Sequence, residues 1–149
     1  MPHGHRIPLA PPSGHPDCER VPGGEANTGP RGHGLPVSGG MAIAARLDGS
    51  TRRTFCLVGD GELQEGQFWE SLGSAANLGL GEIVAIIDHN KIQSDTWVRT
   101  VSDLGDIEAK LRAFGWHVSR CDGHDVRAIE RTFRALDAVT DRPKVILAD

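Results

Sequence analysis

The chain has 149 residues, of which 38% are hydrophobic and 24% are charged, and its formal net charge is −4. This length suits one compact domain with a core and is too short for two. The acidic balance speaks against a general nucleic-acid or polyanion surface, so a phosphate ligand would be held locally by a metal or by backbone amides.

The cysteine count and the N-terminal sequence indicate a cytoplasmic protein. Three widely spaced cysteines form no CxxC pair, which fits a reducing compartment, and Cys56 lies inside an apolar run and is expected in the core. No stretch reaches the roughly 18 apolar residues of a membrane helix. The first residues, MPHGHRIPLAPPSG, lack the apolar region of a secretory signal.

The first part of the chain is rich in proline and glycine and has no periodicity. We expect residues 1–14 to be a poorly ordered segment and residues 15–33 to be an irregular loop. A helix is predicted over 34–47, although its Gly39-Gly40 pair weakens it. Such small residues favour close approach of another backbone or of a ligand.

From residue 54 onward, short apolar runs alternate with segments of helical spacing. Strands are predicted at 54–58, 82–88, 116–121 and 143–149, helices at 67–79, 103–114 and 125–139, and a loop at 91–102. Asp125 is the expected N-cap of the last helix. Continuous apolar strands alternating with helices predict an α/β fold with a parallel sheet covered on both faces.

Two polar residues follow neighbouring predicted strands. Asp60 lies just past one strand and Asn90 just past the next, 30 positions later, which is the length of one strand–helix–strand unit. Ligands of open α/β sheets bind beyond the carboxyl ends of the strands. Carboxylate, carboxamide and carbonyl oxygens suit Mg²⁺ or Ca²⁺ rather than zinc. Gly59 and Gly61 permit a tight turn and close approach of a diphosphate, although a GDG sequence is also an ordinary strand-to-helix turn.

Three sequence blocks together resemble the first half of a transketolase: GHPDCERVPGGEANTGPRGHG (14–34), LVGDGELQEGQFWES (57–71) and IIDHNKIQSD (86–95). GDG followed by Asn at this interval resembles the thiamine-diphosphate motif, and GELQEG narrows the resemblance to the transketolase branch. The resemblance implies a partial thiamine-diphosphate-binding fold over residues 15–149, with thiamine diphosphate and Mg²⁺ as cofactors.

The same resemblance assigns roles to single residues. It implies that Asp60, Asn90 and the backbone carbonyl of Ile92 are Mg²⁺ ligands and that Gly61 contacts the diphosphate. The loop beside the aminopyrimidine ring would be Gly29-Pro30-Arg31.

Three further residues match groups of the family that act on the substrate or between cofactor sites. Glu65 and Glu70 match acids of a network that links the cofactor sites across the dimer interface. His15 matches a histidine that hydrogen-bonds the hydroxyls of the donor sugar.

A partner is implied as well. The resemblance implies ketol transfer between sugar phosphates, with the cofactor supplying the chemistry. In this family the activating glutamate lies on a separate pyrimidine-binding domain. We therefore expect a pyrimidine-binding (C-terminal) transketolase subunit, in a homodimer or heterotetramer, and an isolated chain without turnover.

The sequence departs from the family pattern in three respects. The family's first hundred or so residues are missing, Arg31 stands where the family usually has Leu, and Gly24 stands where it has an apolar residue. A non-catalytic remnant that binds Mg²⁺ or dimerises is therefore the alternative hypothesis. A relative that acts on 2-oxo acids or makes deoxyxylulose phosphate is a third, which GELQEG and GHPD disfavour. Trp97 follows the Asn90 loop and is expected either over the cofactor or in the core.

Overall fold

A four-stranded parallel sheet forms the centre of the molecule. The computed structural model describes residues 24–26, 29 and 31–149. The sheet has the strand order β1–β2–β6–β5, with the strands at β1 (Thr54–Gly59), β2 (Ile83–Asp88), β5 (His117–Cys121) and β6 (Lys144–Ala148). The predicted α/β class with a parallel sheet is confirmed.

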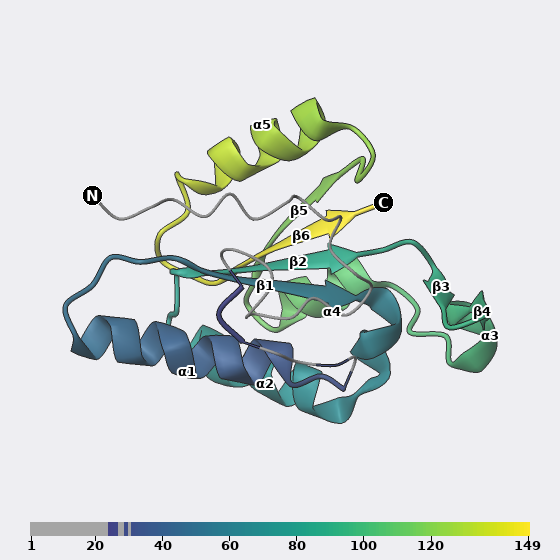
Figure 1. The fold of residues 1–149 in the computed structure, drawn as a ribbon, viewed down its shortest axis with the longest axis horizontal. Helices are drawn as coiled ribbons and strands as arrows, with labels where there is room; N and C mark the ends of the chain where they lie inside the picture. The colour runs from purple at the N-terminus through teal and green to yellow at the C-terminus, as the bar shows by residue number, and fades with distance from the viewer. Residues whose placement is uncertain (1–23, 27–28, 30) are drawn as a thin grey trace, which may run out of the picture.

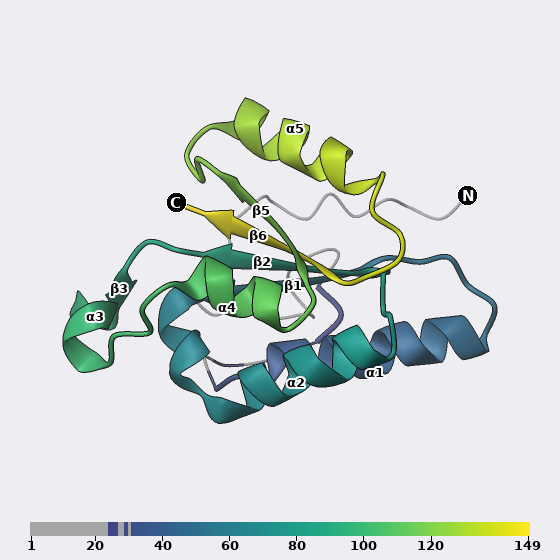
Figure 2. The same ribbon diagram turned by 180° about the vertical axis from the view of Figure 1, so that it is seen from behind.

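Helices lie on both faces of this sheet (Figures 1 and 2). One face is covered by α1 (Gly34–Leu47), α2 (Gly66–Asn77) and α4 (Ile107–Ala113), and the other by α5 (Val126–Leu136). Side chains alternate between the faces because successive strand residues point to opposite sides. The larger core includes Cys56, as predicted, together with Val58, Ala85, Ile87, Val145 and Leu147; the smaller core under α5 contains Val84, Leu136 and Ile146.

The face under α5 is only partly covered. Phe55 packs edge-on against Phe133 of α5, with ring centroids 6.0 Å apart, but remains 48% exposed. Leu57 on the same face of β1 is 72% exposed. Within the part of the chain that the structure describes, β1 therefore carries an open apolar face.

Residues 91–102 were predicted to be a loop, and this was wrong. They form the antiparallel pair β3 (Ile92–Gln93) and β4 (Thr96–Trp97) and the short helix α3 (Val98–Val101). We call this the β3–α3 segment; it projects from the carboxyl end of β2 (Figure 1). The side-chain amide of Gln64 holds it to the body by donating to the carbonyls of Val98 (3.4 Å) and Ser102 (3.2 Å).

Side-chain caps fix the starts of α4 and α5. Asp106 accepts a hydrogen bond from the Ala109 N–H at 2.9 Å and so starts α4 later than predicted. Asp125 caps α5 as predicted, accepting from Arg127 N–H. A short 3₁₀ helix, η1 (Asp60–Gln64), was not predicted. None of the helices described is long and apolar enough to cross a bilayer.

Three predictions are not tested by these observations. The poorly ordered segment 1–14 and the donor-sugar residue His15 lie outside the described residues. The assignment of residues 15–149 to one partial domain stays a prediction.

Candidate functional site at the carboxyl ends of the strands

The register of the sheet brings the two predicted site segments to one edge. β1 pairs with β2 in parallel, and Gly59 lies opposite Asp88. Asp60 therefore leaves the sheet beside the His89-Asn90 segment, which confirms that the strands before Asp60 and Asn90 are neighbours. Adjacent strands lie about 5 Å apart, so the two segments are close enough to contact each other.

Asp60 is a buried carboxylate with one unpartnered oxygen. Its side chain is only 1% exposed. Oδ2 accepts a hydrogen bond from the Lys91 N–H at 2.7 Å, whereas Oδ1 is buried and has no hydrogen-bond donor among the described residues. Burial raises the pKa of Asp60, and the Lys91 N–H opposes this rise. A buried carboxylate oxygen without a donor is the environment that a bound cation would satisfy.

Asn90 forms the turn that follows β2. Its Oδ1 accepts from the Ile92 N–H at 2.8 Å, and its Nδ2 donates to Oδ2 of Asp88 at 3.1 Å. The carboxamide oxygen has a second lone pair, so this bond leaves it able to bind a cation. Lys91 adopts a left-handed conformation with φ 69°, which bends the chain back toward Asp60.

The residues of the turn suit a hard cation and an anionic ligand. Among the described residues, no three His, Cys, Asp or Glu side chains gather as a metal cluster. The predicted ligand set is of another type, with one carboxylate, one carboxamide and one backbone carbonyl, and such oxygen donors are those of Mg²⁺. Gly59 has open space where a Cβ would lie, and Gly61 packs against Gln93.

Glu62 connects this turn to the loop predicted to lie beside the aminopyrimidine. Its Oε1 accepts from the Gly32 N–H at 2.8 Å, and the side chain is buried. Burial raises the pKa of Glu62, and the bond from Gly32 opposes the rise. The side chain of Gln67 also donates to the carbonyl of Arg31. Glu62 was not singled out from the sequence, although it lies inside the GELQEG block.

The other predicted residues lie at several places. Gly29 is half-buried, Arg31 is exposed, and Pro30 is outside the described residues. Glu65 is exposed where α2 begins. Glu70 is exposed on α2 and lines a groove of about 370 Å³ between α1 and α2, away from the Asp60 cavity. The structure thus brings Asp60 and the Asn90 turn together, and Glu70 belongs to a different surface.

A cavity of about 270 Å³ opens beside Asp60 and is lined by Asp60, His89, Lys91, Trp97, Val98 and Ile107, among others. Of the two positions expected for Trp97, the core is wrong, because the residue is 52% exposed and forms part of the cavity wall.

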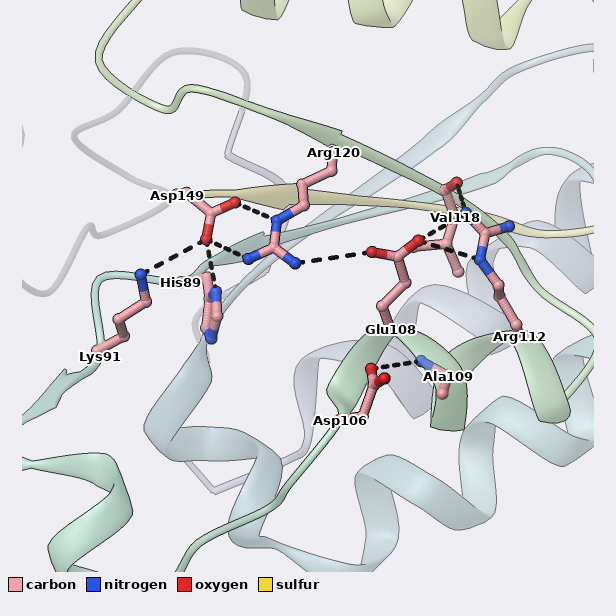
Figure 3. A network of polar contacts seen from close by, with 9 residues as sticks. All are labelled: His89, Lys91, Asp106, Glu108, Ala109, Arg112, Val118, Arg120 and Asp149. Atoms are coloured by element: carbon pink, nitrogen blue, oxygen red, sulfur yellow. Dashed lines mark hydrogen bonds and ion pairs between the residues drawn. The ribbon is translucent and has the colours of Figure 1, made fainter.

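His89 is held in this wall by Asp149, which in turn accepts from Arg120; Figure 3 shows this network continuing to Glu108 of α4. No pattern in the sequence indicates the pair of His89 and Asp149, because 60 positions separate its two members.

The fold and the site define the class of protein. It is an α/β domain in which a carboxylate and a turn with an asparagine carboxamide meet at the carboxyl edge of a parallel sheet. The family model described as "Transketolase, thiamine diphosphate binding domain" matches residues 9–149. The chain therefore belongs to the transketolase family, and the part of the family that it matches is the thiamine-diphosphate-binding domain.

Individual relatives agree with this assignment. The chain is 40% identical over 136 residues to one of the subunits of an apulose-4-phosphate transketolase of Actinobacillus succinogenes, covering 91% of this chain and 49% of that protein. It is 35% identical to a 6-deoxy-6-sulfo-D-fructose transketolase subunit of a Clostridium species, covering 89% and 48%. It thus spans about half the length of these two relatives.

A crystal structure of transketolase from Campylobacter jejuni superimposes with a TM-score of 0.80 at 30% identity, covering 91% of this chain and 22% of that one. The fold predicted from the sequence is thus that of part of a transketolase.

Proposed function

We propose that this chain is the Mg²⁺- and thiamine-diphosphate-binding half of a transketolase that moves two-carbon ketol units between sugar phosphates. The observation that supports this most is Asp60, a buried carboxylate that lines a cavity at the carboxyl edge of the sheet and whose Oδ1 has no donor in the part of the chain that the structure describes. Membership of the family and the names of the two relatives that are transketolase subunits support the same function.

In this proposal, the chain's own residues bind and orient the cofactor. The side-chain oxygens of Asp60 and Asn90 and the carbonyl of Ile92 hold Mg²⁺, and Gly59 and Gly61 let the backbone approach the diphosphate. The loop of Gly29, Pro30 and Arg31 lies beside the aminopyrimidine. Thiamine diphosphate, when bound, supplies the carbanion-stabilising chemistry of ketol transfer.

A partner completes the enzyme. Relatives named as transketolase subunits favour a second subunit, and we propose that it carries the pyrimidine-binding domain and the activating glutamate. Glu65 and Glu70 are exposed, which leaves them free to join a network across an interface between chains. His15 would contact hydroxyls of the donor sugar.

Calorimetry tests the cofactor site. We expect thiamine diphosphate to bind the wild type weakly, with an affinity that rises with Mg²⁺. Asp60→Ala should abolish the Mg²⁺ effect while the circular dichroism spectrum stays unchanged. Asp95→Ala, which removes an exposed carboxylate of the same segment, is the matched control and should bind like the wild type. Equal binding by Asp60→Ala and the wild type would refute the assignment.

A second experiment tests the need for a partner. The purified chain, given a ketose phosphate, an aldose acceptor, Mg²⁺ and cofactor, should show no turnover, whereas adding a pyrimidine-domain subunit from the same genome should restore it. Turnover by the chain alone would refute the proposal that it is half of an enzyme and needs a partner. Cofactor binding without turnover under any pairing would favour the non-catalytic module instead.

A further inference from the structure

We propose that Gln93 is an additional binding residue of this site and that its side-chain oxygen accepts a hydrogen bond from a water molecule held by Mg²⁺. The inference rests on the proposed function and adds to it a residue for which neither the sequence motif nor the family match gives a role. Gln93 lies in β3, three positions after Asn90, and its strand partner is Thr96 of β4.

The side chain of Gln93 lies directly against the turn that would receive the diphosphate. A Cβ added to Gly61 would come within 2.6 Å of the Gln93 Cβ and within 3.0 Å of Oε1. No real side chain tolerates the first distance, so Gly61 and Gln93 are in tight contact. The carboxamide of Gln93 is therefore placed beside the residue that follows Asp60.

The Oε1 atom of Gln93 is buried and has no hydrogen-bond donor among residues 24–26, 29 and 31–149. Asp60 Oδ1 is in the same state, and in the part of the chain that the structure describes these two oxygens are the buried side-chain polar atoms without a partner. Native proteins seldom leave such atoms unpaired unless a ligand, an ion or water completes them. Asp60 begins η1, and Gln93 of β3 packs against Gly61, the residue after Asp60. We infer that one bound group satisfies both unpaired acceptors.

The chemistry of the two oxygens differs, and this identifies what each would bind. The Asp60 carboxylate is charged and suits direct coordination of the cation. The Gln93 carboxamide is neutral, and its oxygen suits a hydrogen-bond donor. Mg²⁺ dehydrates reluctantly and keeps several waters, and a water polarised by the ion is a strong donor. Substituting a residue that hydrogen-bonds a metal ligand typically lowers metal affinity by about 10- to 100-fold.

Two variants separate this role from simple packing over Gly61. Gln93→Met keeps the length and the contact with Gly61 but removes the oxygen acceptor. Gln93→Glu keeps the acceptor and removes the amide donor. The measurements are Mn²⁺ binding followed by electron paramagnetic resonance and thiamine diphosphate binding at increasing Mg²⁺ followed by calorimetry. Thermal unfolding without metal serves as the packing control.

We expect Gln93→Met to weaken Mn²⁺ binding and the Mg²⁺-dependent cofactor affinity by about tenfold while its melting temperature without metal stays near that of the wild type. Gln93→Glu should bind the metal as well as or better than the wild type. Metal-dependent binding by Gln93→Met equal to that of the wild type would overturn the inference and leave the proposed function standing. So would a greater loss in Gln93→Glu than in Gln93→Met, because the amide would then be donating to the ligand. A wild type without any Mg²⁺-dependent binding would overturn both proposals.

Discussion

Nδ1 of His89 lies 2.9 Å from Oδ1 of Asp149, and this contact joins the ends of β2 and β6 beside the Asp60 cavity. Asp149 also accepts from Arg120 of β5 at 2.8 Å (Figure 3). The Arg120 guanidinium, and after it His89, lower the pKa of Asp149 to about 2. One carboxylate thus ties three strand ends together.

This network predicts acid-sensitive stability. Because the folded-state pKa of Asp149 is below its unfolded value of 3.8, its contribution is present above about pH 4 and is lost as the pH falls toward 2. After allowance for solvent screening, Asp149→Asn should lower the free energy of unfolding by about 1 kcal/mol at pH 6 and by progressively less toward pH 2. Urea unfolding at a series of pH values measures this, with Asp95→Asn as an exposed control. A constant difference between Asp149→Asn and the wild type across that range would contradict it.

We expect the Asp60 carboxylate to destabilise the metal-free protein while enabling it to bind Mg²⁺. Burial raises the pKa of this carboxylate, so its charged form destabilises the protein without metal above the unfolded pKa of 3.8. At neutral pH and in the presence of a chelator, Asp60→Asn should therefore increase the free energy of unfolding by an amount on the order of 1 kcal/mol. The increase should appear as a higher melting temperature. Mg²⁺ should then stabilise the wild type and leave Asp60→Asn unchanged. If Asp60→Asn were less stable than the wild type in the presence of a chelator, groups of the protein itself would already be stabilising the charged carboxylate.

Gly61 and Gly59 offer a matched pair of alanine substitutions. An added Cβ at Gly61 meets the Gln93 Cβ at 2.6 Å, whereas at Gly59 it meets nothing within 4 Å and the backbone has an ordinary φ of −82°. Gly61→Ala should lower the free energy of unfolding by about 1–3 kcal/mol because the β3–α3 segment must move. Gly59→Ala should be neutral or slightly stabilising. Chemical denaturation distinguishes them, and equal stabilities would mean that the segment yields at little cost.

The N-cap of α4 lies within the stretch of chain that lines the cavity, between Gly105 and Ile107. Asp106 accepts from the Ala109 N–H at 2.9 Å, and Ile107, the next residue, lines the cavity. Asp106→Ala should cost about 1 kcal/mol, whereas Asp106→Ser should retain most of the stability because serine is also an effective cap. Hydrogen exchange at the amides of the first turn of α4 would localise the effect. Uniform loss of protection across the sheet would argue for a global cause instead.

The sheet and the meeting of Asp60 with the Asn90 turn could be predicted from the sequence. Continuous apolar runs before Asp60 and Asn90 specify buried parallel strands, and parallel strands end at the same edge. The β3–α3 segment could not be predicted, because residues 91–102 carry no apolar period and their shape depends on Gln64 and on the left-handed Lys91. Helical spacing in 125–139 places Val126 and Leu136 on one face of α5, but only Leu136 is buried, and Val126 is 78% exposed.

The contacts of Gln93 and Asp149 were beyond sequence reasoning for a different reason. Gln93 touches Gly61, 32 positions earlier, and Asp149 reaches His89 across 60 positions. Such pairs are set by the three-dimensional path of the backbone, and neither residue type is distinctive at its place in the chain. Glu62 lies within the GELQEG motif, but its bond to Gly32 joins residues 30 positions apart and has no signal in the sequence.

The register between β1 and β2 also limits which changes in chain length the site can absorb. Gly59 pairs with Asp88, and each strand then delivers its polar residue in the next one or two positions. Deleting one residue inside β1 would reverse the side-chain alternation for part of that strand, so that either Val58 would leave the core or Asp60 would turn toward the opposite face. An insertion between Leu78 and Gly81, in the turn before β2, would leave the register at the carboxyl edge intact. We therefore expect length variation among functional relatives at the amino edge of the sheet and constant spacing at the carboxyl edge.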